Sequence, residues 1–256
     1  MEQQFYEEYA RIQDVHWWFV ARRRILAAVL RRRLGPAGDA NRRILDVGCG
    51  TGANLEMLDR FGRVIGVDME SGAVELCRER GWDVRQSEGA RLPFGDGEFD
   101  LVTLLDVIEH VADDREILGE ARRVLAPGGS IVVTVPAYQW MWGAQDEISH
   151  HHRRYTRRRL IEAFDRSGLR LVRATYFNAI LFAPIAAIRL LRRLVPGPSA
   201  PRSDFEDTPP GRVNALLTRA FTWEASIVPR VQLPFGVSLL AVVELPTGSA
   251  APSPRP

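Results

Sequence analysis

Hydrophobic residues alternate along the chain between two periodicities. Short apolar runs with the length and β-branched content of buried strands occupy residues 43–47, 64–68, 82–86, 99–105 and 130–135. Between them, residues 54–61, 70–80 and 113–125 carry apolar side chains at helical spacing, and Pro127-Gly128-Gly129 follows the last of these segments. Strand and helix signals that alternate in this way predict an α/β fold with a parallel sheet.

The segments on either side complete the predicted organisation. Two further strands are expected at residues 169–176 and 237–245, separated by a helical insertion over residues 178–235. The apolar run 179–188 within it contains Pro184 and is too short to span a membrane, so we expect a helix packed over the domain, with a helix lying on a membrane surface as the alternative. We divide the chain into an N-terminal helical lid segment (1–40), a domain (41–245) whose insertion includes a loop at 196–211, and a disordered tail (246–256).

The amino-acid composition excludes several classes of function. The formal net charge of the 256 residues is only +2, from 34 basic and 32 acidic side chains, which is too balanced for non-specific nucleic-acid binding. All basic residues are arginine, and the absence of lysine excludes Schiff-base chemistry and a phosphate-binding P-loop. Two cysteines, Cys49 and Cys77, fit a reducing, cytoplasmic compartment, and the acidic first ten residues lack the apolar stretch of a signal peptide.

A glycine-rich turn is the sharpest motif. Residues 44–52, with Asp46, Gly48, Gly50 and Gly52, run from a buried strand into the turn and then into a helix. Gly48-x-Gly50-x-x-Ala53 also satisfies the dinucleotide fingerprint, with Asp68 placed to accept ribose hydroxyls. However, a carboxylate at Asp46 would repel a pyrophosphate and attract an ammonium group, which favours a nucleoside that carries an amino acid.

From this point the chain closely resembles the class I S-adenosylmethionine-dependent methyltransferases. The resemblance covers about residues 41–136: the glycine-rich motif, Asp68, Glu88-Gly89-Ala90-Arg91-Leu92-Pro93-Phe94, Asp106-Val107-Ile108-Glu109-His110 and Arg123 to Gly129. It implies a Rossmann-like sheet of seven strands, the last antiparallel, with helices on both faces. It also implies a set of residues that bind S-adenosylmethionine: Asp46, Gly48, Gly50, Gly52, Asp68, Met69, Glu88, Gly89 and Leu105. Glu88 and Gly89 depart from the aspartate and alanine that are usual in such proteins.

Histidines are the candidates for acid–base chemistry. A hydroxyl acceptor loses its proton as it attacks the methyl group, and histidine suits this role near neutral pH. His110 follows the fourth strand, and His150, His151 and His152 follow the fifth, where ligands gather in open α/β sheets. Asp146, His151 and Arg153 to Thr156 resemble a segment of a largely uncharacterised bacterial branch of these methyltransferases. We match His151 to its histidine and keep His110, His150 and His152 as alternatives. A helix-capping surface run is the competing interpretation.

A metal site is a second hypothesis for the same region. On a helical turn, Asp106, Glu109 and His110 would project from one face. With His151 they resemble the ligands of certain metal-dependent O-methyltransferases, in which a divalent cation such as Mg²⁺ would acidify a hydroxyl group.

The function that we expect is methylation of a hydroxyl group on a small molecule, a sugar or a lipid-linked glycan. The partner is thus a small or lipid-linked acceptor rather than a nucleic acid, and a peripheral membrane contact stays open. An NAD-dependent oxidoreductase is the alternative, as is a non-catalytic module that binds the cofactor; the oxidoreductase would leave Asp46 and Leu92-Pro93-Phe94 without a role. The sequence predicts no oligomeric state.

Overall fold

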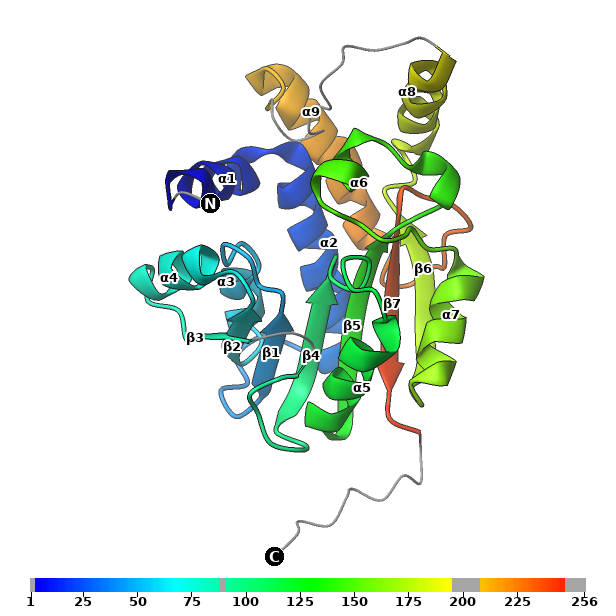
Figure 1. Cartoon of the computed structure of the whole chain (residues 1–256). Coiled ribbons are helices and arrows are strands. Elements are labelled where there is room, and N and C mark those ends of the chain that lie inside the picture. Colours follow the sequence, from blue (N-terminus) through cyan, green and yellow to red (C-terminus); the bar gives the residue numbers. More distant parts are fainter. Residues whose placement is uncertain (1–2, 88–90, 195–207, 247–256) are drawn as a thin grey trace, which may run out of the picture.

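One mixed sheet of seven strands organises the molecule. The computed structural model describes residues 3–87, 91–194 and 208–246 (Figure 1). The strand order is β3-β2-β1-β4-β5-β7-β6. The strands are β1 (Arg43–Val47), β2 (Arg63–Asp68), β3 (Val84–Gln86), β4 (Phe99–Leu105), β5 (Leu125–Pro136), β6 (Arg170–Phe177) and β7 (Ser238–Glu244).

Strand direction confirms the predicted fold class. The strands β1 to β5 pair in parallel, whereas β7 inserts antiparallel between β5 and β6, with Val133 opposite Ala241. The chain reverses after β3 to place β4 beside β1, so the carboxyl ends of β1 and β4 meet where the strand order changes direction. In open sheets of this kind, ligands bind at that position.

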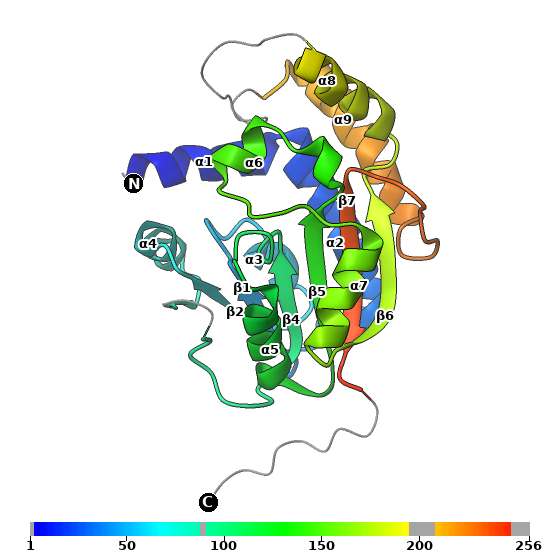
Figure 2. The ribbon, with the colours of Figure 1, turned by 45° about the vertical axis from the view of Figure 1, so that its right-hand side comes forward.

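Helices cover both faces of the sheet (Figures 1 and 2). Apolar side chains of α5 and α7 pack on one face, and those of α2, α3 and α4 pack on the other. The helices are α1 (Gln3–Val15), α2 (Trp17–Leu34), α3 (Leu55–Asp59), α4 (Ser71–Glu79), α5 (Asp114–Val124), α6 (Ala144–Ile148), α7 (Arg157–Arg166), α8 (Phe182–Leu194) and α9 (Gly211–Thr222), with short 3₁₀ helices at Gln139–Met141 (η1) and Trp223–Ser226 (η2).

The N-terminal segment forms two helices. His16 follows the end of α1 and caps α2, because its side chain accepts a hydrogen bond from the backbone N–H of Trp18. Ile25, Leu26 and Val29 are buried on the face of α2 that joins the hydrophobic core. This helix is therefore part of the domain core, while α1 lies across the end of the sheet where β1 and β4 finish (Figure 2).

The described part of the insertion before β7 consists mainly of helices, namely α8, α9 and η2. The buried carboxylate of Glu224 in η2 accepts hydrogen bonds from the backbone N–H groups of Asn178, Ala179 and Ile180, which fixes the start of the insertion against its end. No helix within the described residues is long and apolar enough to cross a membrane. Residues 196–207 of the predicted loop and 247–256 of the predicted tail lie outside the described residues.

Candidate active site

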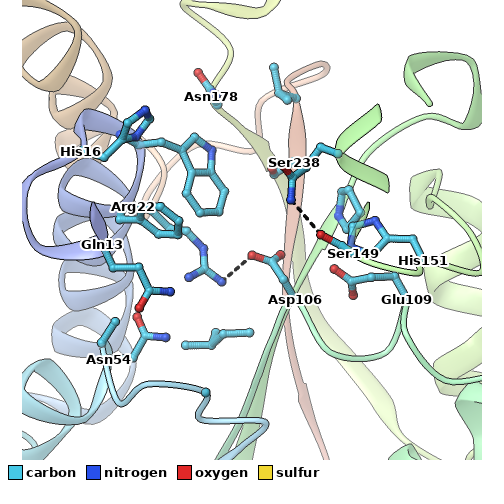
Figure 3. Close-up of a pocket in the computed structure, with 18 of the residues that line it drawn as sticks. Gln13, His16, Arg22, Asn54, Asp106, Glu109, Ser149, His151, Asn178 and Ser238 are labelled. Atoms are coloured by element: carbon cyan, nitrogen blue, oxygen red, sulfur yellow. Dashed lines mark hydrogen bonds and ion pairs between the residues drawn. The ribbon is translucent and has the colours of Figure 1, made fainter. Parts of the chain in front are cut away.

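A cavity of about 480 Å³ lies at the carboxyl ends of β1 and β4. Its floor includes the glycine-rich loop after β1 and the turn after β4, and its roof comes from α1, α2 and α8. Figure 3 shows Gln13 and Asn54 on one side of the cavity and Glu109, Ser149 and His151 on the other, with Asp106 between them. The cavity thus joins the predicted cofactor loop to the predicted catalytic histidines.

The glycine-rich loop has the geometry of a backbone cradle. Gly48, Gly50 and Gly52 all have positive φ, at 68°, 54° and 82°. The backbone N–H of Gly50 donates to the Asp68 carboxylate over 2.7 Å, and no atom of the described residues lies within 4 Å of the position that a side chain on Gly50 would take. Free space above a glycine loop of this kind fits a ligand that lies against the backbone.

Gly48→Ala is expected to lower the free energy of unfolding by about 1 kcal/mol, because alanine is strained at positive φ. An added Cβ would also lie 2.6 Å from Cγ2 of Val107. Gly50→Ala is the matched control, since Gly50 shares the positive φ but an added Cβ would meet no atom of the described residues. Chemical denaturation measures the free energy of unfolding of both variants. If the two variants are equally stable, the contact with Val107 does not contribute to the loss of stability at Gly48.

Asp46 lies below the loop rather than in the cavity. It is 1% exposed, and Thr103 Oγ1 donates to its Oδ1 over 2.6 Å. Burial raises its pKa to about 7, although the Thr103 hydrogen bond and Arg22 act in the opposite direction. Its other oxygen has no hydrogen-bond partner among the described residues. A direct contact with an ammonium group therefore stays a prediction.

The remaining predicted cofactor residues are distributed around the loop. Leu105 lines the cavity, Asp68 is half-buried at the end of β2, and Met69 is 60% exposed. Glu88 and Gly89 lie outside the described residues.

Glu109, His110 and His151 gather at the far side of the cavity. One potential ligand atom from each lies within 4.8 Å of the others. The rings of His110 and His151 are 4.5 Å apart and nearly perpendicular. Burial lowers the pKa of His110 to about 4 and raises that of Glu109 well above its ordinary value. The structure therefore places two of the three predicted histidines together.

A buried carboxylate orients His151. Asp146, which is 0% exposed, accepts hydrogen bonds from His151 Nδ1 at 2.9 Å and from Arg154 Nε and Nη2 at 2.7 and 2.9 Å. Burial raises the pKa of Asp146, but the His151 and Arg154 hydrogen bonds outweigh it and bring the value to about 2. An ionised Asp146 on Nδ1 leaves Nε2 of His151 available to the cavity.

The structure corrects the predicted helical turn at Asp106 to His110. These residues form an irregular turn in which Asp106 has φ of 61°. Asp106 forms an ion pair with the buried Arg22 at 2.8 Å and accepts a hydrogen bond from Thr134, so it does not belong to the group formed by Glu109 and the two histidines. His150 is exposed with φ of 53° and does not line the cavity.

Some residues that line the cavity could not be predicted as site residues from the sequence. Asn178 is fully buried on the cavity wall with both polar side-chain atoms lacking a partner among the described residues. Gln13 of α1 accepts a hydrogen bond from Thr51 of the glycine-rich loop over 2.5 Å. Neither residue belongs to a motif, because each reaches the cavity from a segment remote in sequence.

Comparison with known proteins identifies the domain. Residues 45–133 match a family model described as a methyltransferase domain. A probable S-adenosylmethionine-dependent methyltransferase of Mycolicibacterium smegmatis is 38% identical over 100 residues, covering 38% of this chain and 39% of that protein. A ubiquinone biosynthesis O-methyltransferase of Methylococcus capsulatus is 35% identical over 100 residues, covering 36% and 42%. The chain thus spans less than half the length of these two relatives.

A solved structure extends the similarity in fold to most of the chain. It is the complex between a methyltransferase activator and a methyltransferase of Haloferax volcanii, with a TM-score of 0.59, 21% identity, and 94% of this chain and 96% of that chain covered. The fold, with its glycine-rich loop after β1, is that of the Rossmann-like methyltransferases. The chain carries a class I S-adenosylmethionine-dependent methyltransferase domain, which confirms the resemblance seen in the sequence.

Proposed function

We propose that the protein transfers the methyl group of S-adenosylmethionine to a hydroxyl group of a small molecule, a sugar or a lipid-linked glycan. The main support for this proposal is that the glycine-rich loop and the two histidines His110 and His151 line the same cavity. The relative from Methylococcus capsulatus, named as an O-methyltransferase, supports an oxygen acceptor.

The cofactor fits the residues around the loop. We propose that the backbone of Gly48, Gly50 and Gly52 contacts the amino-acid part, and that the half-buried Asp68 accepts hydrogen bonds from the ribose hydroxyls. When bound, S-adenosylmethionine supplies a methyl group on a positively charged sulfur. The hydrogen bond between Gln13 and Thr51 supports a role for α1 as a cover of this half of the cavity.

Proton removal is the chemical task left to the protein. As the acceptor oxygen forms its bond to the methyl carbon, its proton must pass to a base, and Nε2 of His151 is the available nitrogen of an imidazole fixed by Asp146. In-line displacement otherwise requires alignment and exclusion of water. The roof of α1 and α2 supports the second requirement.

The acceptor side of the cavity combines apolar and polar groups. The cavity lining here includes Trp17, Trp18, Ile185 and Ile188, together with the amide of Asn178, which has no hydrogen-bond partner among the described residues. On α8 the exposed fractions of Ile188 and Leu191 reach 50% and 59%. Apolar side chains that continue from the cavity onto the surface support an acceptor with a hydrophobic part, and a peripheral membrane contact of α8 belongs to the same proposal.

The test has two readouts. Calorimetry with S-adenosylhomocysteine and with NAD measures cofactor choice. Transfer of an isotope-labelled methyl group to a panel of hydroxyl acceptors, with RNA included, measures activity and its acceptor. We expect binding of S-adenosylhomocysteine and labelling of a hydroxyl compound. Binding without transfer to any acceptor would favour a non-catalytic module, and preference for NAD would contradict the proposal.

A further inference from the structure

Glu109 is a buried carboxylate that forms no ion pair with another described residue. Its side chain is 0% exposed, and neither oxygen has a hydrogen-bond partner on another described residue. The two neighbouring carboxylates are compensated, since Asp106 pairs with Arg22 and Asp146 pairs with Arg154. An uncompensated carboxylate in the protein interior costs several kcal/mol unless it is protonated or meets a cation.

The two imidazoles beside Glu109 are held in the manner of metal ligands. Nδ1 of His151 bonds to Asp146, and His110 bonds to the backbone carbonyl of Ser149. One nitrogen of each ring therefore forms a hydrogen bond to an oxygen. The other nitrogen keeps its lone pair for a metal ion. Oxygen partners of this kind fix the tautomer of ligating histidines in metalloproteins and orient their rings.

The separation of the three donors suits one ion. Zinc binds histidine nitrogen and carboxylate oxygen at about 2.0 to 2.2 Å in a tetrahedral arrangement, so the donors of a common ion lie about 3.3 to 3.6 Å from each other. The present donors all lie within 4.8 Å of one another, so binding of an ion would draw them closer together. The group also borders the cavity, which leaves space for a further ligand.

We propose that Glu109, His110 and His151 bind one divalent transition-metal ion, of the class of Zn²⁺, Mn²⁺, Fe²⁺ or Co²⁺. Two imidazoles and one carboxylate suit these ions better than Mg²⁺, which prefers oxygen ligands. The set replaces the Asp106-based magnesium site expected from the sequence. The role of the ion rests on the proposed function: it would coordinate the acceptor hydroxyl and lower its pKa, with His151 then a ligand and not the base.

The test is a titration of the chelator-treated full-length protein with Co²⁺, followed by visible absorption, and displacement of Co²⁺ by Zn²⁺. We expect one ion per chain. Glu109→Gln and His151→Ala should each weaken binding by about 100-fold or more, because substitutions even outside the ligand set cost about 10- to 100-fold. His152→Ala is the matched control, since its exposed ring lies one residue from the ligand His151 but outside the ligand group, and it should bind as the unaltered protein does.

S-adenosylhomocysteine affinity, measured on the same samples, reports folding of each variant independently of the metal. The proposal is overturned if the unaltered protein binds no Co²⁺, or if Glu109→Gln or His151→Ala binds it unchanged. If Glu109→Gln does not fold, the proposal is tested by His151→Ala, at a half-buried residue, and by the number of Co²⁺ ions that the unaltered protein binds. Metal binding without any methyl transfer would contradict the proposed function and leave the metal site standing.

Discussion

Replacement of His151 by alanine is expected to lower kcat for the true acceptor by roughly 100-fold or more, with almost no change in affinity for S-adenosylmethionine. General-base catalysis contributes about this factor, and a ligand of an activating ion would be as costly to lose. The cofactor affinity should be preserved because His151 lies across the cavity from Asn54, beside the glycine-rich loop (Figure 3). Steady-state kinetics with calorimetry of cofactor binding measures both effects.

His152→Ala is the matched control for this prediction. His152 is exposed, follows His151 directly, and lies outside the cavity lining. Its loss should leave kcat nearly unchanged. Equally small losses in the two variants would show that His151 is not needed for catalysis and would shift the search for a base to His110 and Glu109.

Replacement of Asp68 by alanine is expected to weaken S-adenosylhomocysteine binding by about 2 kcal/mol or more, which is roughly 30-fold. Two losses combine. The ribose hydroxyls would lose a charged acceptor, and the backbone N–H groups of Gly50 and Glu70 would lose the carboxylate that now accepts their hydrogen bonds at 2.7 and 3.0 Å.

Two further variants separate these contributions. Asp68→Asn keeps an oxygen for the N–H of Gly50 but removes the charge, so its affinity should lie between those of the unaltered protein and the alanine variant. Asp83→Ala removes an exposed carboxylate at the amino end of the neighbouring strand β3, away from the carboxyl ends of the strands, and should have no effect. Calorimetry that finds unchanged affinity in Asp68→Ala would remove Asp68 from the proposed site.

Local sequence determined the framework of the domain. Residues within about ten positions along the chain are enough to predict the buried strands that end at glycine or acidic residues. Examples are residues 43–47, which precede Gly48, and residues 63–68, which end at Asp68. Their hydrophobic periodicity and the conformational freedom of glycine need no tertiary information. For this reason the strand positions, the α/β class and the methyltransferase resemblance could all be predicted, with differences of a few residues at the ends of elements such as β3 and β5.

Tertiary structure decided which side chains meet. The spacing of Asp106, Glu109 and His110 suggested one ligand face, but Arg22 reaches Asp106 from α2, across 84 positions of the chain, and pairs with it. Likewise, the triple histidine does not reveal which ring enters the cavity; the buried pair Asp146–Arg154 selects His151, while His150 and His152 remain exposed. Charge pairing and burial act through space, so the sequence supplied the candidate residues and only the folded chain distinguished among them.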